Sequence, residues 1–241
     1  SMIADCQANS IKILGRTLWP HSLGIFYTAV CQFIGFDRFG EEYKVMGLSA
    51  YGVNRFAPEM RKLVNYDPQR GIELDLNYYR HHQMMEAVEH DQLGDGEVSV
   101  PRLWSDRMRE LFGPPRDRKN PLSERDRDIA ASLQSRFEEV YLAHVAKSVA
   151  LTGCRDVVMA GGSVLNSVGN GRMITERVVD RAYFHPAASD DGTAAGAALY
   201  VLHAKHNVPR APWLQHGYLG TEYSDDQIEK AVAASGLPFR K

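Results

Sequence analysis

The sequence predicts an α/β fold with a helical insertion. Two apolar strands, at 156–160 and 180–184, are each followed by a segment with helical spacing. Strands and helices that alternate in this way form a parallel sheet with helices on its faces. Frequent prolines over 53–122 interrupt the pattern and mark the insertion. At 241 residues the chain has room for one large domain or two small ones.

The N-terminal part predicts a short strand at 11–14, followed by helices at 22–36 and 41–50. Apolar residues recur every three or four positions in the first helix, which gives it one buried face. We expect Gly35 to end this helix, because glycine readily adopts the left-handed conformation found after a helix C-terminus.

The segment 53–122 is the least regular part of the chain. Strand-like pieces lie at 62–66 and 71–76, a loop is expected at 91–97, and 102–112 has helical spacing.

A long helix is the clearest single prediction. Charges alternate in sign over 116–128, which is typical of a solvated surface. Within this run, Ser123 and Asp126 form a capping box at the start of a helix that should extend to about residue 152. Gly153 is the expected C-cap.

The C-terminal third supplies the predicted parallel strands. The strand at 156–160 reads Asp-Val-Val-Met-Ala, an apolar run of the kind found in buried strands, and a helix is expected to start near Ser163. A helix rich in small residues follows at 192–206, and a shorter helix at 224–235 should begin at the capping residue Ser224.

Composition excludes several classes of protein. The formal net charge of −2 leaves no basic excess for a general nucleic-acid binder. No apolar run approaches the ~20 residues of a membrane span, so no membrane partner is expected. The three cysteines include no C-x-x-C pair, which argues against a disulfide scaffold or zinc ribbon and favours a cytoplasmic location.

The strongest local signal is A-G-G-S-V-L-N at 160–166. Gly161 and Gly162 would let a ligand approach the backbone closely, and the following helix would offer unpaired N–H groups to an anion. Asn166, one turn into that helix, could donate to and accept from a sugar or base. A tight strand–helix turn without a ligand explains the same residues.

A second signal is S-D-D-G-T-A-A-G-A-A at 189–198. Asp190 and Asp191 follow a strand and precede a helix, where a carboxylate could hold a divalent cation. Capping of the helix is the simpler reading of the same acids.

A third signal is G-E-E-Y-K-V-M-G-L-S-A-Y-G at 40–52. Gly40 and Lys44 stand at the start of a charged helix that glycines also close. A capped surface helix with Lys44 in a salt bridge is the alternative to a binding role.

Together these segments resemble the NodU/CmcH family of carbamoyltransferases. The matching stretches, in order, are W-P-H-S-L-G-I-F-Y-T-A-V at 19–30, the glycine-bracketed segment at 40–52, V-M-A-G-G-S-V-L-N-S-V-G-N-G-R at 158–172 and P-A-A-S-D-D-G-T-A-A-G-A-A-L-Y at 186–200. Four long matches in one order are far more specific than a single glycine pair.

The resemblance implies an enzyme that transfers a carbamoyl group to a hydroxyl of a small-molecule acceptor. In that family an RNase H-like pair of lobes, of the actin/sugar-kinase/heat-shock ATPase fold with a mixed sheet, holds the nucleotide. A YrdC-like domain makes carbamoyl-adenylate from carbamoyl phosphate and ATP, and a divalent metal, often iron(II), assists the transfer. The acceptor and carbamoyl phosphate are therefore the expected small-molecule partners.

The resemblance also assigns residues. Asn166 matches an asparagine at the adenosine part, Gly161 and Gly162 match backbone beside the nucleotide, and Gly40 matches a glycine at the ribose. Lys44 matches a position that is Asp in the tRNA threonylcarbamoyl transferases, which this family resembles.

Asp190 matches the metal-binding aspartate, with Asp191 as its neighbour, whereas no catalytic base is assigned. The family's H-x-x-x-H metal motif does not occur in the chain. Residues 1–210 are therefore expected to form the second lobe, with the insertion at 53–122, and 211–241 a linker towards a YrdC-like domain. The absent first lobe and YrdC-like domain would be partners from the same polypeptide.

This fragment alone is expected to be inactive. Two other functions remain open at this point. One is a non-catalytic nucleotide-binding module of the same fold, and the other is a sugar-kinase-like phosphotransferase.

Overall fold

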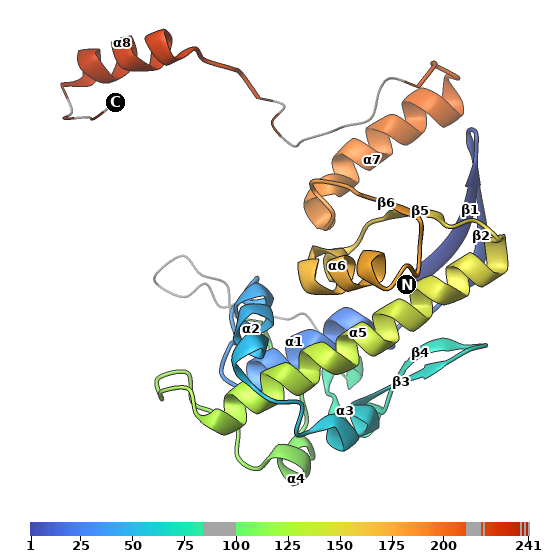
Figure 1. Cartoon of the computed structure of the whole chain (residues 1–241), viewed down its shortest axis with the longest axis vertical. Coiled ribbons are helices and arrows are strands. Elements are labelled where there is room, and N and C mark those ends of the chain that lie inside the picture. Colours follow the sequence, from blue (N-terminus) through green and yellow to red (C-terminus); the bar gives the residue numbers. More distant parts are fainter. Residues whose placement is uncertain (84–99, 211–217, 219, 237, 239, 241) are drawn as a thin grey trace. The chain divides into compact units, whose positions relative to one another are not determined.

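A computed structural model describes residues 1–83, 100–210, 218, 220–236, 238 and 240. The chain divides into two compact units, Ser1–Pro209 and Arg210–Lys241 (Figure 1). The loop expected at 91–97 lies outside the described residues.

The larger unit contains all of the described strands and most of the helices. Its strands are β1 (Met2–Gln7), β2 (Ser10–Arg16), β3 (Val64–Asp67), β4 (Gly71–Leu74), β5 (Asp156–Met159) and β6 (Arg181–Phe184). Its α-helices are α1 (Leu23–Phe33), α2 (Glu42–Leu48), α3 (Ala57–Leu63), α4 (Met108–Phe112), α5 (Glu124–Thr152), α6 (Ser167–Thr175) and α7 (Thr193–Tyr200). The smaller unit contains α8 (Asp225–Ser235).

The strands form three separate two-stranded sheets in the described part of the chain. β1 pairs with β2 and β3 with β4, both antiparallel, while β5 and β6 are parallel, with α6 between them in sequence. The parallel pair confirms the predicted α/β unit. A single mixed sheet is not seen, because the two hairpins pair within themselves and do not join β5 and β6.

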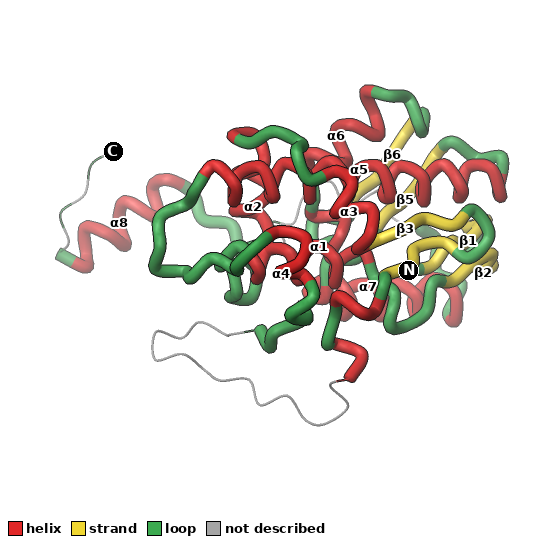
Figure 2. Tube along the Cα trace, turned by 90° about the horizontal axis from the view of Figure 1, so that it is seen from below, coloured by secondary structure: helices red, strands yellow, loops and turns green. Residues whose placement is uncertain are grey.

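Two hydrophobic clusters line the long helix α5. The larger joins its N-terminal half to α1 and to side chains from the segment 53–122, including Met60, Trp104 and Phe112. The smaller joins its C-terminal half to β5, β6 and α6. Figure 2 shows the strands gathered towards one end of this unit and α1 to α4 towards the other. The insertion is thus part of the main core.

Helix ends follow the sequence signals closely. Ser22 caps α1 by accepting from the amide of Ile25, and Gly35 follows it with a φ of +80°. Ser123 and Asp126 form both bonds of the capping box of α5, and Gly153 ends that helix in the left-handed conformation. Ser224 and Gln227 form both bonds of the capping box of α8. These predictions are confirmed.

The charged run at 116–128 is not simply a solvated surface, so that prediction is wrong. Arg116 donates through its amide and its Nε to the carbonyls of Phe33 and Ile34, at 3.0 and 2.7 Å. The end of α1 leaves carbonyls without helical partners, and a cation satisfies them well. Asp126 and Asp128 are also buried.

Three other expectations need correction. The apolar strand β5 is not buried on both faces, since Val158 is 67% exposed on the side that no described element covers. Only 108–112 of the expected helix at 102–112 is helical, because Trp104 forms a β-bridge with Tyr79 instead. The helix α3 was not predicted. Within the described residues, no helix combines the length and apolar character needed to cross a bilayer.

Candidate functional site

Two loops emerge side by side from the parallel strands. Met159 pairs with Phe184 at the last position of the β5–β6 register, so 160–166 and 185–192 leave the sheet at the same edge. Ligands of open α/β sheets bind outside the carboxyl ends of their strands. The two strongest sequence signals therefore meet at the edge where a ligand is expected.

Direct contacts tie these loops together. The amide of Gly161 donates to the carbonyl of Ala188 at 2.6 Å. The Cβ position of Gly162 lies 3.6 Å from the Ser189 hydroxyl. Gly161 has a φ of +112°, which side chains with a Cβ rarely adopt. The turn is exposed at both glycines, so it is neither buried nor remote from the acidic loop.

Glycine permits a close approach of backbone within the acidic loop, and the two carboxylates of the loop lack partners among the described residues. A Cβ atom on Gly192 would overlap the carbonyl oxygen of Ala187, so only glycine fits there. Asp190 and Asp191 are exposed in the short turn before α7, and neither carboxylate has a hydrogen-bond partner among the described residues. Helix capping, the simpler reading, does not account for them.

The N-terminus of α1 reaches the same turn. The Cβ position of Gly24 lies 3.8 Å from the Ser163 hydroxyl and 3.6 Å from that of Ser22. No acidic residue occupies the first turn of α1. The positive end of this helix dipole therefore lies beside the glycine turn without a carboxylate of its own to neutralise it.

Asn166 is placed differently from the sequence expectation. It is the N-cap of α6, which starts at Ser167 after a short turn at 162–165, and its Oδ1 accepts from the Gly169 amide at 2.9 Å. The helix does not start near Ser163, and Asn166 is not one turn into it. The cause is the strong preference of Asn for the N-cap position.

A buried polar network holds Asn166. Its amide exchanges two hydrogen bonds of 3.0 Å with Gln134 on α5. Gln134 also accepts from Tyr27 and donates to Glu138, each at 2.8 Å. Glu138 in turn accepts from Arg172 of α6 at 2.9 Å. Three helices are thus fastened behind the glycine turn, and burial raises the pKa of the Tyr27 phenol.

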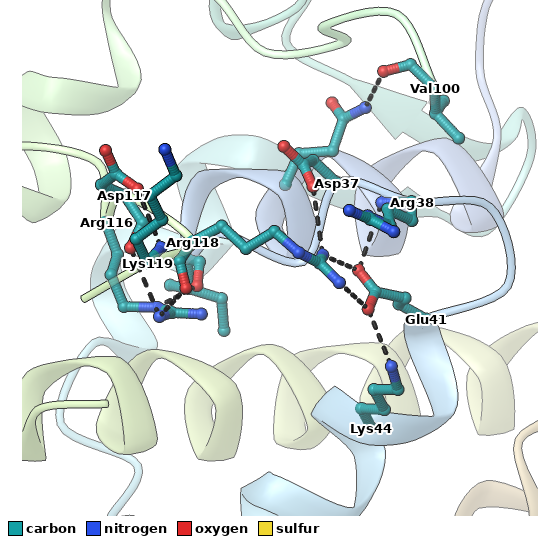
Figure 3. Close-up of polar contacts among 11 residues, drawn as sticks. Asp37, Arg38, Glu41, Lys44, Val100, Arg116, Asp117, Arg118 and Lys119 are labelled. Carbon is teal, nitrogen blue, oxygen red and sulfur yellow. Dashed lines mark hydrogen bonds and ion pairs between the residues drawn. The ribbon is translucent and has the colours of Figure 1, made fainter. Parts of the chain in front are cut away.

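Gly40 and Lys44 lie at the start of α2, next to a buried carboxylate. Gly40 has a φ of +82°, and the Lys44 ammonium pairs with Glu41 at 2.8 Å. Figure 3 shows Arg118 reaching the same carboxylate, with bonds of 2.6 and 2.8 Å to its two oxygens. The expected salt bridge of Lys44 therefore exists, and its partner is Glu41.

Electrostatics fix the charge of Glu41. Burial alone would raise the pKa of this carboxyl, but hydrogen bonds from Arg118 and Lys44 outweigh that effect and lower it to about 2. Among the described residues, no hydrogen bond or ion pair joins Gly40 or Lys44 to the two strand-end loops. The nearest described link is between α2 and α6, where the Ser167 hydroxyl lies 3.9 Å from the Met46 sulfur.

A family model described as "Carbamoyltransferase N-terminus" matches residues 5–199, which include both loops and the segment at 40–52. The chain belongs to the NodU/CmcH-type carbamoyltransferase family.

The curated relatives that the chain matches are longer proteins. It is 31% identical over 229 residues to an uncharacterised protein of Synechocystis, covering 92% of this chain and 35% of the relative. It is 30% identical over 181 residues to the nodulation protein NolO of Bradyrhizobium diazoefficiens, covering 75% and 28%. It is 26% identical over 236 residues to the nodulation protein NolNO of Sinorhizobium fredii, covering 98% and 31%. The chain spans about a third of the length of these relatives.

The metal that the family implies does not fit the described residues on their own. They bring together no group of three His, Cys, Asp or Glu side chains that could hold an ion. The nearest histidine in the acidic loop, His185, uses its Nδ1 with the backbone of Ala187. The role of Asp190 as a metal ligand stays a prediction.

Sequence reasoning missed several residues around these loops. Ser189 and Ser163 contact the glycines of neighbouring elements, and His185 stands directly after β6. The position of His185 after a strand and before two acids was a usable signal. No sequence signal indicated Arg118 or Gln134, because each forms hydrogen bonds with residues far away in sequence.

Proposed function

We propose that this chain supplies part of the donor site of an O-carbamoyltransferase. The donor is carbamoyl-adenylate, formed from ATP and carbamoyl phosphate, and the acceptor is a hydroxyl of a small molecule. The observation that carries the proposal is the bond between Gly161 and Ala188, which joins an exposed glycine turn to a loop with two unused carboxylates.

The main contribution that carbamoyl transfer requires of this region is to bind and orient the donor. The oxygen of the acceptor hydroxyl forms a bond to the carbamoyl carbon and its proton passes to a base that is not assigned in this chain, while the bond from that carbon to the phosphate oxygen breaks and AMP leaves with the electron pair. The Gly161 amide is already bonded to the Ala188 carbonyl, so the exposed Gly162 and the N-terminus of α1 are the groups that favour an anionic donor at this edge. The Asn166 network supports the turn from behind, which limits its movement when the donor binds.

We also propose that residues 1–210 are the second lobe of an actin/sugar-kinase-like pair of RNase H-like lobes, with 211–241 as a linker. Support comes from the parallel β5–β6 pair, whose Val158 stays exposed, and from α7, where no residue is buried. Uncovered apolar strands and helices of this kind suit a sheet that continues in the rest of a longer polypeptide. Alone, the chain is expected to bind nucleotide weakly and to give no turnover.

A glycine substitution tests the donor site. Gly162→Leu places a side chain between the two loops, where a Cβ makes only an ordinary contact with Ser189, so the fold should tolerate it. Gly171→Leu on α6 is the matched control, because its Cβ position is open. In titration calorimetry with ATP and with AMP, Gly162→Leu should abolish binding while Gly171→Leu retains it. Equal affinities for both variants would refute the site.

A second candidate is a non-catalytic nucleotide-binding module. It is favoured by the lack of a three-ligand metal group among the described residues. Asp190→Asn separates the two functions. In a metal-dependent donor site this change removes the dependence of ATP affinity on the divalent cation, whereas Asp226→Asn, an exposed acid on α8, leaves it unchanged. In a simple binding module neither change matters. In the longer polypeptide, release of AMP and not ADP distinguishes carbamoyl transfer from a kinase.

A further inference from the structure

A cavity lies within the insertion, and no residue of the strand-end loops lines it. Its volume is about 400 Å³, and its walls are the segments 76–83 and 102–106. This size is in the range of sites for small organic molecules. We call it the Arg80 pocket, and the residues that matter most are Arg80, His82, Arg102 and Asp106.

The pocket is built on a rigid frame. Tyr79 and Trp104 form a β-bridge between its two walls, and both side chains are buried. The amide of Arg80 donates to the carbonyl of Leu103 at 2.7 Å, and that of Ser105 donates to the carbonyl of Tyr78 at 2.9 Å. Because the walls are fastened together before any ligand arrives, binding would cost little ordering of the backbone.

Positive charge dominates this frame. Arg102 is held over the Trp104 ring at 4.2 Å and pairs with Asp106 at 3.2 Å. Arg109 pairs with the same carboxylate at 3.1 Å, so two guanidinium groups share one acid. Arg80 adds a third, and its exposed guanidinium has no carboxylate partner among the described residues.

The acids nearby do not cancel that charge. The Asp75 carboxylate accepts hydrogen bonds from the backbone and side-chain amides of Asn77 and so caps the turn at 76–78. Hydrogen bonding from Arg102 lowers the pKa of Asp106, so this acid stays ionised and orients its two arginines. Arg80 and part of Arg102 remain available to a ligand.

His82 also lines the cavity, and one of its ring nitrogens lacks a partner. The Nδ1 of His82 is buried and has no hydrogen-bond partner. Buried polar atoms without partners are uncommon in folded proteins and point to a missing water, ion or ligand. His82 is therefore a second polar side chain beside Arg80 in the wall of the cavity.

We propose that the Arg80 pocket binds a small molecule through an oxyanion, either a phosphate or a carboxylate. Guanidinium groups recognise both through paired N–H donors. The proposal is independent of the donor site, since no residue of the two strand-end loops lines this cavity. Failure of either proposal would leave the other unaffected.

Binding of simple anions tests the proposal and distinguishes the two ligand chemistries. Inorganic phosphate and acetate are titrated separately into the full 241-residue chain, followed by amide chemical shifts in NMR spectra. Saturable shifts are expected at Arg80, His82 and Ser105, with the tighter anion naming the ligand class. Shifts only at Gly161–Gly162 would place the anion at the donor site and overturn the proposal.

A matched pair of variants makes the test specific. Arg80→Gln removes an exposed cation without a partner, so the protein should fold normally, and the apparent Kd should rise about tenfold, or 1.4 kcal/mol. Arg107→Gln removes an exposed cation from the same segment that does not line the pocket, and it should leave the Kd unchanged. Equal weakening in both variants would indicate general charge attraction and contradict a defined site.

Discussion

Asn166 and Gln134 exchange two amide hydrogen bonds, each 3.0 Å long, between the start of α6 and the middle of α5. Gln134 uses its remaining donor and acceptor on Glu138 and Tyr27. Every polar atom of the Gln134 side chain is therefore satisfied in a buried position. This pair connects the glycine turn to the longest helix of the chain.

The first prediction concerns this pair. Gln134→Leu removes hydrogen bonds from three buried polar partners, Tyr27, Asn166 and Glu138, and we expect it to lower the free energy of unfolding by about 2–4 kcal/mol. Asn166→Ala also removes the cap of α6 and should cost about 1–3 kcal/mol. The double variant should cost less than the sum, by about 1 kcal/mol, in urea denaturation. Strict additivity would mean that the two amides do not interact.

The second prediction concerns acid stability. The pKa of Glu41 is about 2 in the folded chain and 4.5 as its ordinary value. A lowered carboxyl pKa stabilises the fold above the ordinary value, and this contribution is lost as pH falls from 4.5 towards 2. Glu41→Gln should flatten the decline of stability in that window. Glu110→Gln, an exposed acid on α4, should leave the decline as it is in the unmodified chain.

A third prediction concerns His144 on α5. Both of its ring nitrogens are buried without partners, and burial lowers its pKa from 6.5 to about 4. The unfolded chain then binds this proton more readily, so stability falls as pH drops from 6.5 to 4. His144→Leu should remove that slope in denaturation curves, whereas His206→Leu, at an exposed position, should not. A slope that survives His144→Leu would assign the effect elsewhere.

The fourth prediction compares two capping boxes that both begin with serine, one with Asp126 and the other with Gln227 as the reciprocal partner. Ser123 caps α5, which lines both hydrophobic clusters, and Ser224 caps α8, which has no buried residue. Ser123→Ala should lower the free energy of global unfolding by about 1 kcal/mol. Ser224→Ala should reduce helical circular dichroism without moving the midpoint of that transition. The comparison fails if both variants shift the midpoint equally.

Local signals made the helix ends predictable, whereas contacts between distant residues were not. Ser123, Asp126 and Gly153 act within one turn of the helix that they start or end, so their roles can be read directly from the sequence. Arg118 and Glu41 are 77 positions apart, and no pattern in either segment indicates the other. For this reason the alternating charges at 116–128 predicted an open surface, although several of these side chains make contacts within the fold.

In the candidate site, too, local features could be predicted and contacts between distant residues could not. Gly161 and Gly162 stand out because a strand, two glycines and a turn follow one another in sequence. Their neighbour Ser189 and the hydrogen bond to Ala188 depend on the pairing of β5 with β6. Asn166 was found as a candidate, but its N-cap position was missed, because the residues at 162–165 form a short turn of their own before α6 begins.

The length of α5 has a consequence for how the larger unit melts. One uninterrupted helix lines both hydrophobic clusters, and Met159 packs against each of them. Unfolding of either cluster would therefore remove apolar packing contacts from the other. The two clusters should therefore unfold in a single cooperative transition on heating. Local opening near the glycine turn is then coupled to the stability of the insertion.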